Sequence, residues 1–167
     1  MRGPQIILHR PQIPQNTGNI SRLCVAIRSK LIITGKAGFN WDSASLKRAG
    51  LDHWEHLDFQ NVKRLSEILV NPSRRIIAVS KVGDHNIFDF KFNLADVLLF
   101  GNETQGLPPS ALKRCTSIRL PMIGPVRSLN LSNTVAICAY EYLRQIYGAQ
   151  FDHSHKQYAR TYYTRSK

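Results

Sequence analysis

Short runs of apolar and β-branched residues recur along the chain and alternate with segments of helical periodicity. These runs predict strands at residues 5–8, 31–34, 75–79, 97–100 and 117–120. Because helical segments separate several of these strands, the pattern favours a mostly parallel sheet flanked by helices on both faces. That arrangement is an α/β fold.

Near the N-terminus, one helix has a clear apolar face, which consists of Ile20, Leu23, Cys24 and Ile27. Asn16 or Thr17 is a suitable N-cap for this helix, because a short polar side chain can accept a hydrogen bond from the free N–H groups of the first turn. The spacing places Cys24 in the core. Two shorter helices are predicted at residues 43–49 and 62–70.

The last helix has the strongest pattern and is predicted from residue 130 to residue 147. Its apolar stripe consists of Leu131, Val135, Cys138, Tyr142 and Ile146. A position on this stripe favours a core role for Cys138 over a catalytic one. Gly148 is expected to end the helix.

The charge of the chain points to a polyanionic partner. Lys and Arg number 23 against 11 Asp and Glu, which gives a formal net charge of +12 and a pI of about 10.1. This balance favours nucleic acid first and an anionic membrane surface second. The membrane alternative is weaker, because no apolar run approaches the ~20 residues of a spanning helix and the start of the chain lacks the apolar core of a signal peptide.

Length and charge distribution suggest one domain with a basic tail. A chain of 167 residues fits a single domain, expected at residues 1–151, and residues 152–167 form a tail rich in cations and tyrosines. This composition suits phosphate contact combined with base stacking, and it equally suits a frayed polar terminus. The excess of cations at both ends is also compatible with an ordinary basic surface.

The cysteines do not indicate a metal or a disulfide framework. Cys24, Cys115 and Cys138 are widely spaced, and the sequence contains no CxxC or Cys/His pairing. We therefore expect no metal, and we expect a reducing, cytoplasmic setting.

Three polar stretches, rich in Gly and Asn, are left unexplained by the core pattern. They cover residues 9–22, 100–108 and 120–133, and each follows or flanks a predicted strand. Loops at the carboxyl ends of parallel strands are where α/β sheets usually bind ligands. The stretches lack GxGxxG, GxxxxGK[ST] and GxSxG, which disfavours a Rossmann dinucleotide site, a nucleotide-triphosphate loop and a hydrolase elbow.

Within these stretches, several residues could bind a ligand, although composition alone favours a simple left-handed turn for the second stretch. Gly101 and Gly106 bracket a tight turn in which the backbone can approach a ligand closely. Glu103 is a carboxylate at the sheet edge that could hold a hydroxyl or a cation. Short polar side chains crowd the start of the last helix beyond what one cap requires; they are Ser128, Asn130, Ser132 and Asn133.

These stretches contain three motifs in the order found in one known family. The motifs are Asn16-Thr17-Gly18-Asn19-Ile20 with Arg22-Leu23-Cys24, then Phe100-Gly101-x-Glu103-Thr104-x-Gly106-Leu107-Pro108, then Leu120-Pro121-Met122 followed by Arg127-Ser128-Leu129-Asn130-Leu131-Ser132-Asn133. In them the sequence resembles the SPOUT superfamily of RNA methyltransferases, and specifically the small TrmL-like transfer-RNA 2′-O-ribose methyltransferases. The resemblance covers roughly residues 5–147 and leaves the basic tail unaccounted for.

The resemblance implies a C-terminal deep trefoil knot, which binds S-adenosylmethionine, and a homodimer. The cofactor-binding residues that it implies are Val79, Gly101, Leu120, Met122 and Ser128. The residues implied beside the acceptor ribose are Arg22, Asn16, Glu103 and Asn130. The cations expected to contact RNA are Arg10, Arg127, Lys156 and Arg160.

The implied reaction transfers a methyl group from a sulfonium to a ribose 2′-hydroxyl of transfer RNA, expected at the anticodon wobble cytidine or uridine. Because arginine stays protonated in proteins, we interpret Arg22 as an electrostatic clamp on ribose and phosphate. Methylation of another transfer-RNA or ribosomal-RNA position shares every motif. A catalytically silent RNA-binding module is the alternative from another functional class.

Overall fold

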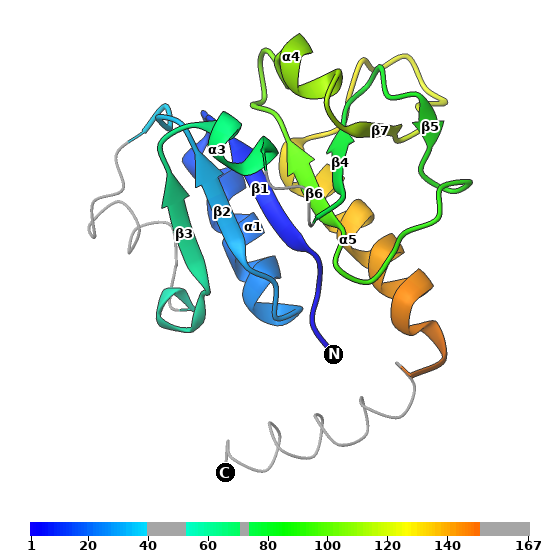
Figure 1. Cartoon of the computed structure of the whole chain (residues 1–167), viewed down its shortest axis with the longest axis horizontal. Coiled ribbons are helices and arrows are strands. Elements are labelled where there is room, and N and C mark those ends of the chain that lie inside the picture. The colour runs from blue at the N-terminus through cyan, green and yellow to red at the C-terminus, as the bar shows by residue number, and fades with distance from the viewer. Residues whose placement is uncertain (40–52, 71–73, 151–167) are drawn as a thin grey trace.

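The computed structural model describes residues 1–39, 53–70 and 74–150 (Figure 1). The helix predicted at residues 43–49 and the tail at residues 152–167 lie outside the described residues. Within the described part, no helix is long and apolar enough to cross a membrane.

A parallel sheet forms the centre of the molecule. Its strands, in chain order, are β1 (Gln5–His9), β2 (Leu31–Thr34), β3 (Phe59–Val62), β4 (Ile76–Val79), β5 (His85–Asn86), β6 (Val97–Phe100) and β7 (Thr116–Arg119). They lie in the order β3-β2-β1-β6-β4-β7-β5, and every pairing between them is parallel. The described residues therefore confirm the predicted α/β fold with a parallel sheet.

Helices cover both faces of this sheet. They are α1 (Pro14–Ala26), α3 (Leu65–Leu69), α4 (Pro109–Leu112) and α5 (Leu131–Tyr147), with short 3-10 turns at η1 (Trp54–His56) and η2 (Gly148–Gln150). The helices α1 and α5 pack against each other behind the sheet in Figure 1.

Alternation along the strands creates two separate cores, because successive side chains of a strand point to opposite faces. On β1, Ile6 and Leu8 join the core that contains Cys24 and Cys138 of α1 and α5. Ile7 points the other way and packs in the core under α3 and α4. Both cysteines are fully buried, as the helical spacing predicts.

One predicted helix is confirmed but begins later than expected. A single helix is expected at residues 62–70, but the chain forms the end of β3 at Val62 and begins α3 only at Leu65. β3 lies at the edge of the sheet and exposes Gln60 and Asn61. The strand therefore lacks the continuous apolar run that identified the central strands.

The last helix, α5, ends at Tyr147 as predicted and begins at Leu131, one residue after the predicted start. Asn130 is its N-cap, and its side chain accepts a hydrogen bond from the backbone N–H of Ser132. Gly148 has φ −42° and ψ −48°, so it stays in the right-handed helical region and leads into η2 without a left-handed stop. The trefoil knot implied by the resemblance stays a prediction.

Candidate functional site

The strand order contains a switch point between β1 and β6. From β1 the chain continues outward through β2 to β3, whereas β4 lies on the other side of β6. The carboxyl ends of these strands share the upper edge of the sheet in Figure 1. In open parallel sheets, the crevice outside such a switch point is the usual place for a ligand.

Glu103, in the loop after β6, connects this loop to the beginning of α1. Its carboxylate accepts hydrogen bonds from the backbone N–H groups of Gln12 (2.8 Å) and Ile13 (3.2 Å) and from Asn16 Nδ2 (2.9 Å). The negative charge also lies where the helix dipole favours an anion. From the sequence, this carboxylate could hold a hydroxyl or a cation, but both of its oxygens accept hydrogen bonds from the chain itself.

Asn16 is consequently a bridging residue rather than an N-cap. Helix α1 begins at Pro14, where the missing N–H of proline costs no hydrogen bond, and Ile13 is its N-cap residue. This arrangement overturns the predicted capping by Asn16 or Thr17. Asn16 is only 4% exposed, lies inside the first turn and faces Glu103.

Asn130 completes the network from the third polar stretch. Its Nδ2 donates to Asn16 Oδ1 at 2.9 Å, and its own Oδ1 accepts from the backbone N–H (2.8 Å) and hydroxyl (2.7 Å) of Ser132. A carboxylate only accepts, so Asn16 must present its NH₂ to Glu103 and its oxygen to Asn130. Residues from all three motifs thus form one hydrogen-bonded network with a fixed direction.

The hydroxyl of Thr17, which the sequence suggested only as a helix cap, is a further candidate for ligand binding. Thr17 is 2% exposed, follows Asn16 on α1, and its Oγ1 has no hydrogen-bond partner among the described residues. Buried polar groups rarely lack a partner in native proteins. The hydroxyl is therefore available to a ligand or to a water molecule beside the network.

The residues implied for cofactor binding gather on the other half of the same edge. Val79 ends β4 and is paired with Phe100 of β6 and Ile118 of β7. Gly101 directly follows β6, and Leu120 directly follows β7. Three adjacent strand ends therefore present backbone groups and small or apolar side chains, a lining that suits an adenine ring held by main-chain hydrogen bonds.

The turn after β6 leaves no space for a side chain at Gly101. A Cβ there would lie 2.0 Å from the carbonyl carbon of Gly106 and 2.3 Å from the amide nitrogen of Leu107. Asn102 and Gly106 form an antiparallel bridge, and Gly106 has φ +70°, which favours glycine. The close return of the chain onto the strand end thus requires glycine at both positions.

We expect Gly101→Ala to destabilise the protein by about 1–3 kcal/mol and to weaken binding of S-adenosylmethionine, because the added methyl group forces the turn away from β6. Thermal unfolding and isothermal titration calorimetry measure the two effects. Gly124→Ala is the matched control, since a Cβ at Gly124 meets no atom within 4 Å. Unchanged stability and unchanged affinity in Gly101→Ala would contradict the packing argument.

Met122 and Ser128 lie in the segment between β7 and α5. Met122 is partly buried, whereas Ser128 is exposed, as are nearly all residues of this segment. Its apolar side chains include Ile123, which is fully exposed, and Val126, which is 58% exposed. Both apolar and polar side chains of this segment are therefore exposed next to the strand ends.

Arg22 lies on α1 but at some distance from Asn16. Six residues separate them, which corresponds to about 9 Å along the helix axis and to different faces of the helix. The Arg22 side chain is exposed. The chain therefore brings Asn16, Glu103 and Asn130 together, and it positions Arg22 farther along the same helix.

Comparison with known proteins identifies the family. A family model described as the SpoU rRNA Methylase family matches residues 4–140. The chain belongs to this family. The sequence is 40% identical over 150 residues to the tRNA (cytidine(34)-2′-O)-methyltransferase of Escherichia coli strain K12, covering 84% of this chain and 92% of the relative.

Solved structures agree with this assignment to the SpoU family. One, described as "Structural insights into the 2-OH methylation of C/U34 on tRNA", has a TM-score of 0.82 and 40% identity, and covers 87% of this chain and 97% of that chain. The SpoU methyltransferase AviRb of Streptomyces viridochromogenes, solved in complex with AdoMet, has a TM-score of 0.74 and 29% identity, and covers 84% of this chain and 57% of that chain. The resemblance found from the motifs is confirmed.

Two of the four cations expected to contact RNA are in the described part of this SpoU chain. Arg10 is exposed directly after β1 and has φ +53°, and Arg127 is exposed in the segment before α5. Lys156 and Arg160 lie outside the described residues.

Cys24 and Cys138 are not suited to act as nucleophiles in this SpoU chain. Burial raises the pKa of Cys24 and of Cys138 to about 12, which disfavours the reactive thiolate at neutral pH. The described residues contain no group of three or more His, Cys, Asp or Glu that could hold a metal ion.

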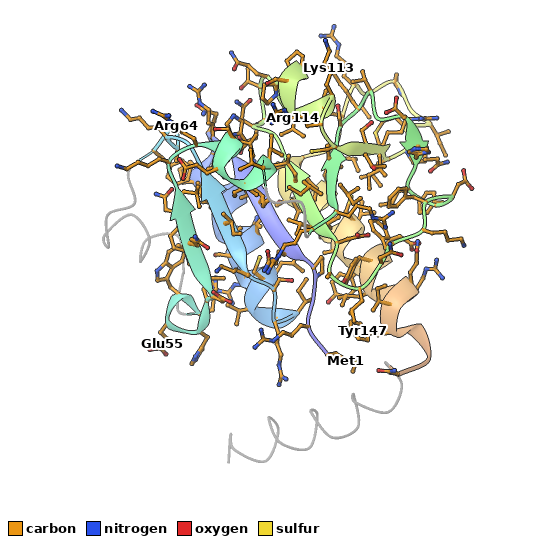
Figure 2. The ribbon with its side chains drawn as sticks, viewed as in Figure 1. Met1, Glu55, Arg64, Lys113, Arg114 and Tyr147 are labelled. Carbon is orange, nitrogen blue, oxygen red and sulfur yellow. The ribbon has the colours of Figure 1, made fainter. Side chains whose placement is uncertain are left out.

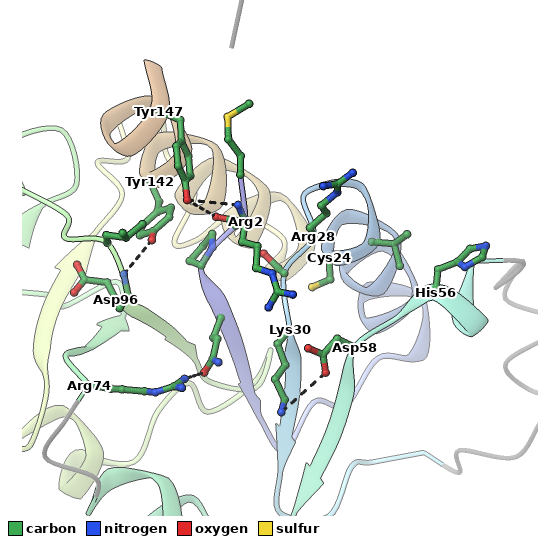
Figure 3. A pocket seen from close by; sticks show the side chains of 18 residues that line it. Arg2, Cys24, Arg28, Lys30, His56, Asp58, Arg74, Asp96, Tyr142 and Tyr147 are labelled. Carbon is green, nitrogen blue, oxygen red and sulfur yellow. Dashed lines mark hydrogen bonds and ion pairs between the residues drawn. The ribbon is translucent and has the colours of Figure 1, made fainter. Parts of the chain in front are cut away.

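A cavity of about 710 Å³ lies at the opposite edge of the sheet, where the strands begin (Figure 3). Its lining includes Arg2, Lys30, Arg74 and Tyr147. The hydroxyl of Tyr147 bonds the backbone of Arg2, and Lys30 pairs with Asp58 at 4.0 Å. We do not assign the functional site to this cavity despite its size, because the three family motifs meet at the other edge of the sheet.

Proposed function

We propose that this protein transfers a methyl group from S-adenosylmethionine to the ribose 2′-hydroxyl of cytidine or uridine at position 34 of transfer RNA. Support comes from its membership of the SpoU family and from relatives whose names specify this reaction. The single structural observation that carries the proposal is the Glu103–Asn16–Asn130 network, which joins all three motifs at the switch point of the sheet.

The cofactor would be held by the strand ends at Val79, Gly101 and Leu120, with Met122 and Ser128 from the following segment. S-adenosylmethionine supplies an already activated methyl group when bound. The protein therefore has mainly to align the ribose hydroxyl with the cofactor, exclude water and assist the loss of one proton.

Each residue of the network then has a definite task. Glu103 fixes the beginning of α1 and the direction of the Asn16 amide. Asn16 and Asn130 present amide groups with a fixed donor and acceptor direction beside the ribose. Arg22, which keeps its charge, would hold the ribose and the neighbouring phosphate, and the proton would pass to a substrate phosphate or to solvent.

Labelled methyl donor and unmodified transfer RNA test the reaction directly. We expect label to enter the RNA, and mass spectrometry of digested RNA should place the methyl group on the ribose at position 34. Label at another position would retain the activity and change the substrate. Tight binding without any label would support a silent RNA-binding module instead.

We further propose that the protein acts in the cytoplasm as a homodimer in which α5 lies at the interface. The face of α5 opposite its buried stripe carries Ile137 and Tyr140, which are 39% and 53% exposed. Leu129, just before the helix, is also 37% exposed. Apolar side chains gathered on one surface beside a functional site are typical of an interface.

Tyr140→Asp is expected to raise the dimer dissociation constant at least about 100-fold, because an unpaired charge buried at an interface costs about 3–5 kcal/mol. Sedimentation equilibrium measures the change. Val82→Asp introduces the same charge at a side chain that is 68% exposed elsewhere and should leave the dimer intact. A Tyr140→Asp protein as dimeric as the Val82→Asp protein would exclude this interface.

A further inference from the structure

The carboxyl ends of three neighbouring strands, β1, β2 and β3, lie level with one another. They form one half of the sheet edge that carries the candidate site. His9 of β1 is paired with Thr34 of β2, which in turn is paired with Val62 of β3. The hydrogen bonds continue one residue further, from Arg10 N to Thr34 O (2.9 Å) and from Gly35 N to Val62 O (3.0 Å). The residues that follow these strands are therefore neighbours across a width of about 10 Å.

Cations follow each of the three strands. They are Arg10 after β1, Lys36 after β2, and Lys63 and Arg64 after β3. All four side chains are exposed, and Figure 2 shows Arg64 at the edge opposite Met1 and Tyr147. The stem of Arg10 extends across Gly35 toward β2, because a Cβ at Gly35 would lie 2.8 Å from Arg10 Cγ.

Carboxylates do not neutralise this row of cations in the described part of the chain. Among the described residues, no ion pair or side-chain hydrogen bond joins these four side chains to an acid. Glu103, on the neighbouring loop, is already bound to the start of α1. Among the described residues, Glu67 of α3 is the acid closest in sequence to these four cations, three residues after Arg64. One acid beside four cations leaves the row with a net positive charge.

The two halves of the edge therefore differ in chemistry. The ends of β6, β4 and β7 carry the residues implied for cofactor binding, and Arg119 there donates to the backbone carbonyls of Gly83 and Asp84. The ends of β1, β2 and β3 are each followed by exposed cations. The Glu103–Asn16–Asn130 network lies where the halves meet. Long, exposed cations in a row suit the phosphates of a flexible strand better than a small ligand, which needs a concave pocket.

We propose that Arg10, Lys36, Lys63 and Arg64 form a phosphate track for the RNA strand that flanks the methylated nucleotide. This inference rests on the proposed function and adds the surface over which the RNA reaches the site. The RNA approaches along β3, β2 and β1, and the methyl donor occupies the opposite half of the edge.

The test replaces all four residues of the track by glutamine and measures binding of an unmodified transfer-RNA transcript with cytidine at position 34 as a function of salt. The slope of log Kd against log salt concentration should decrease by about 2 to 3, since each phosphate contact on a single strand contributes about 0.7. The KM for this RNA should rise 10-fold or more, whereas kcat should stay within about twofold because the track does not touch the reacting atoms.

A matched control removes the same number of charges from the other edge. The variant Arg2→Gln, Lys30→Gln, Arg74→Gln, Lys91→Gln also replaces two arginines and two lysines, and it should keep the salt slope and the KM. Lys91 belongs to this edge because its carbonyl accepts a hydrogen bond from Arg75, directly before the start of β4. Equal losses in both variants would overturn the track, because total charge would then explain the effect. An unchanged slope in the track variant would overturn it as well.

Two further readouts separate this inference from the proposed function. Thermal unfolding and cofactor titration of the track variant should match those of the wild type, which excludes a folding defect. If the wild type binds the transcript but does not methylate it, the proposed function fails while the salt slopes still decide the track. If the wild type methylates position 34 and both variants behave alike, only the track fails.

Discussion

Replacing Arg22 by alanine is expected to reduce methyl transfer to transfer RNA at least about 100-fold while the affinity for S-adenosylmethionine stays unchanged. The expected size is that of removing one donor from a preorganised charge-stabilising site. The guanidinium keeps its proton, so its contribution is to hold ribose and phosphate while negative charge develops on the hydroxyl oxygen. Initial rates with labelled donor and calorimetric cofactor titration measure the two quantities.

Two further variants test whether the loss of activity depends on the guanidinium group at position 22. Arg22→Lys keeps the charge and loses the planar pair of donors, so an intermediate rate is expected. Arg2→Ala removes an exposed arginine at the opposite edge of the sheet and should keep the wild-type rate. Turnover of Arg22→Ala equal to that of Arg2→Ala would remove Arg22 from the site.

Glu103→Gln should lower kcat by about 10- to 100-fold and destabilise the protein by about 2 kcal/mol, because a charged acceptor of three hydrogen bonds becomes a neutral amide. One oxygen is replaced by an NH₂ group that faces a donor. The direction of the Asn16 amide and the start of α1 are then no longer fixed. Steady-state kinetics and urea unfolding measure the changes.

The kinetic pattern distinguishes positioning from simple loss of stability. Because Glu103 acts through Asn16, kcat should fall at temperatures where Glu103→Gln is fully folded, and the KM for S-adenosylmethionine should stay within about twofold. Glu55→Gln, at an exposed acid on η1, should change neither kcat nor stability by a measurable amount. A wild-type kcat for folded Glu103→Gln would rule out this role.

The central strands could be predicted from the sequence because both of their faces are buried. All four residues of β2 and of β6 are buried, so each strand is a continuous apolar run that local pattern reveals. Strand β3 was not predicted, because none of its residues is fully buried and it has no continuous apolar run. At the sheet edge its exposed positions hold Gln60 and Asn61, and only pairing with β2 stabilises the extended conformation.

For the candidate site, too, the sequence predicted one part and only the tertiary structure decided the other. The motifs alone indicated that Asn16, Glu103 and Asn130 belong to one functional site, and the fold brings them into one hydrogen-bonded network. Their bonding could not be predicted, since 87 residues separate Asn16 from Glu103 and 114 separate it from Asn130. Local pattern instead suggested that Asn16 caps α1, whereas Asn16 donates to Glu103 in the loop after β6.

The sequence by itself determined the fold class, the family, the three motifs and the need for a polyanionic partner, because each depends on residue type and local spacing. Only the tertiary structure decided which cations lie next to one another and next to the site. Parallel strands end at a common edge, so residues from Arg10 to Arg64 that are distant in the chain become neighbours beside the network. Strand order, which no local pattern encodes, separates these cations from the strand ends at Val79, Gly101 and Leu120 on the same edge.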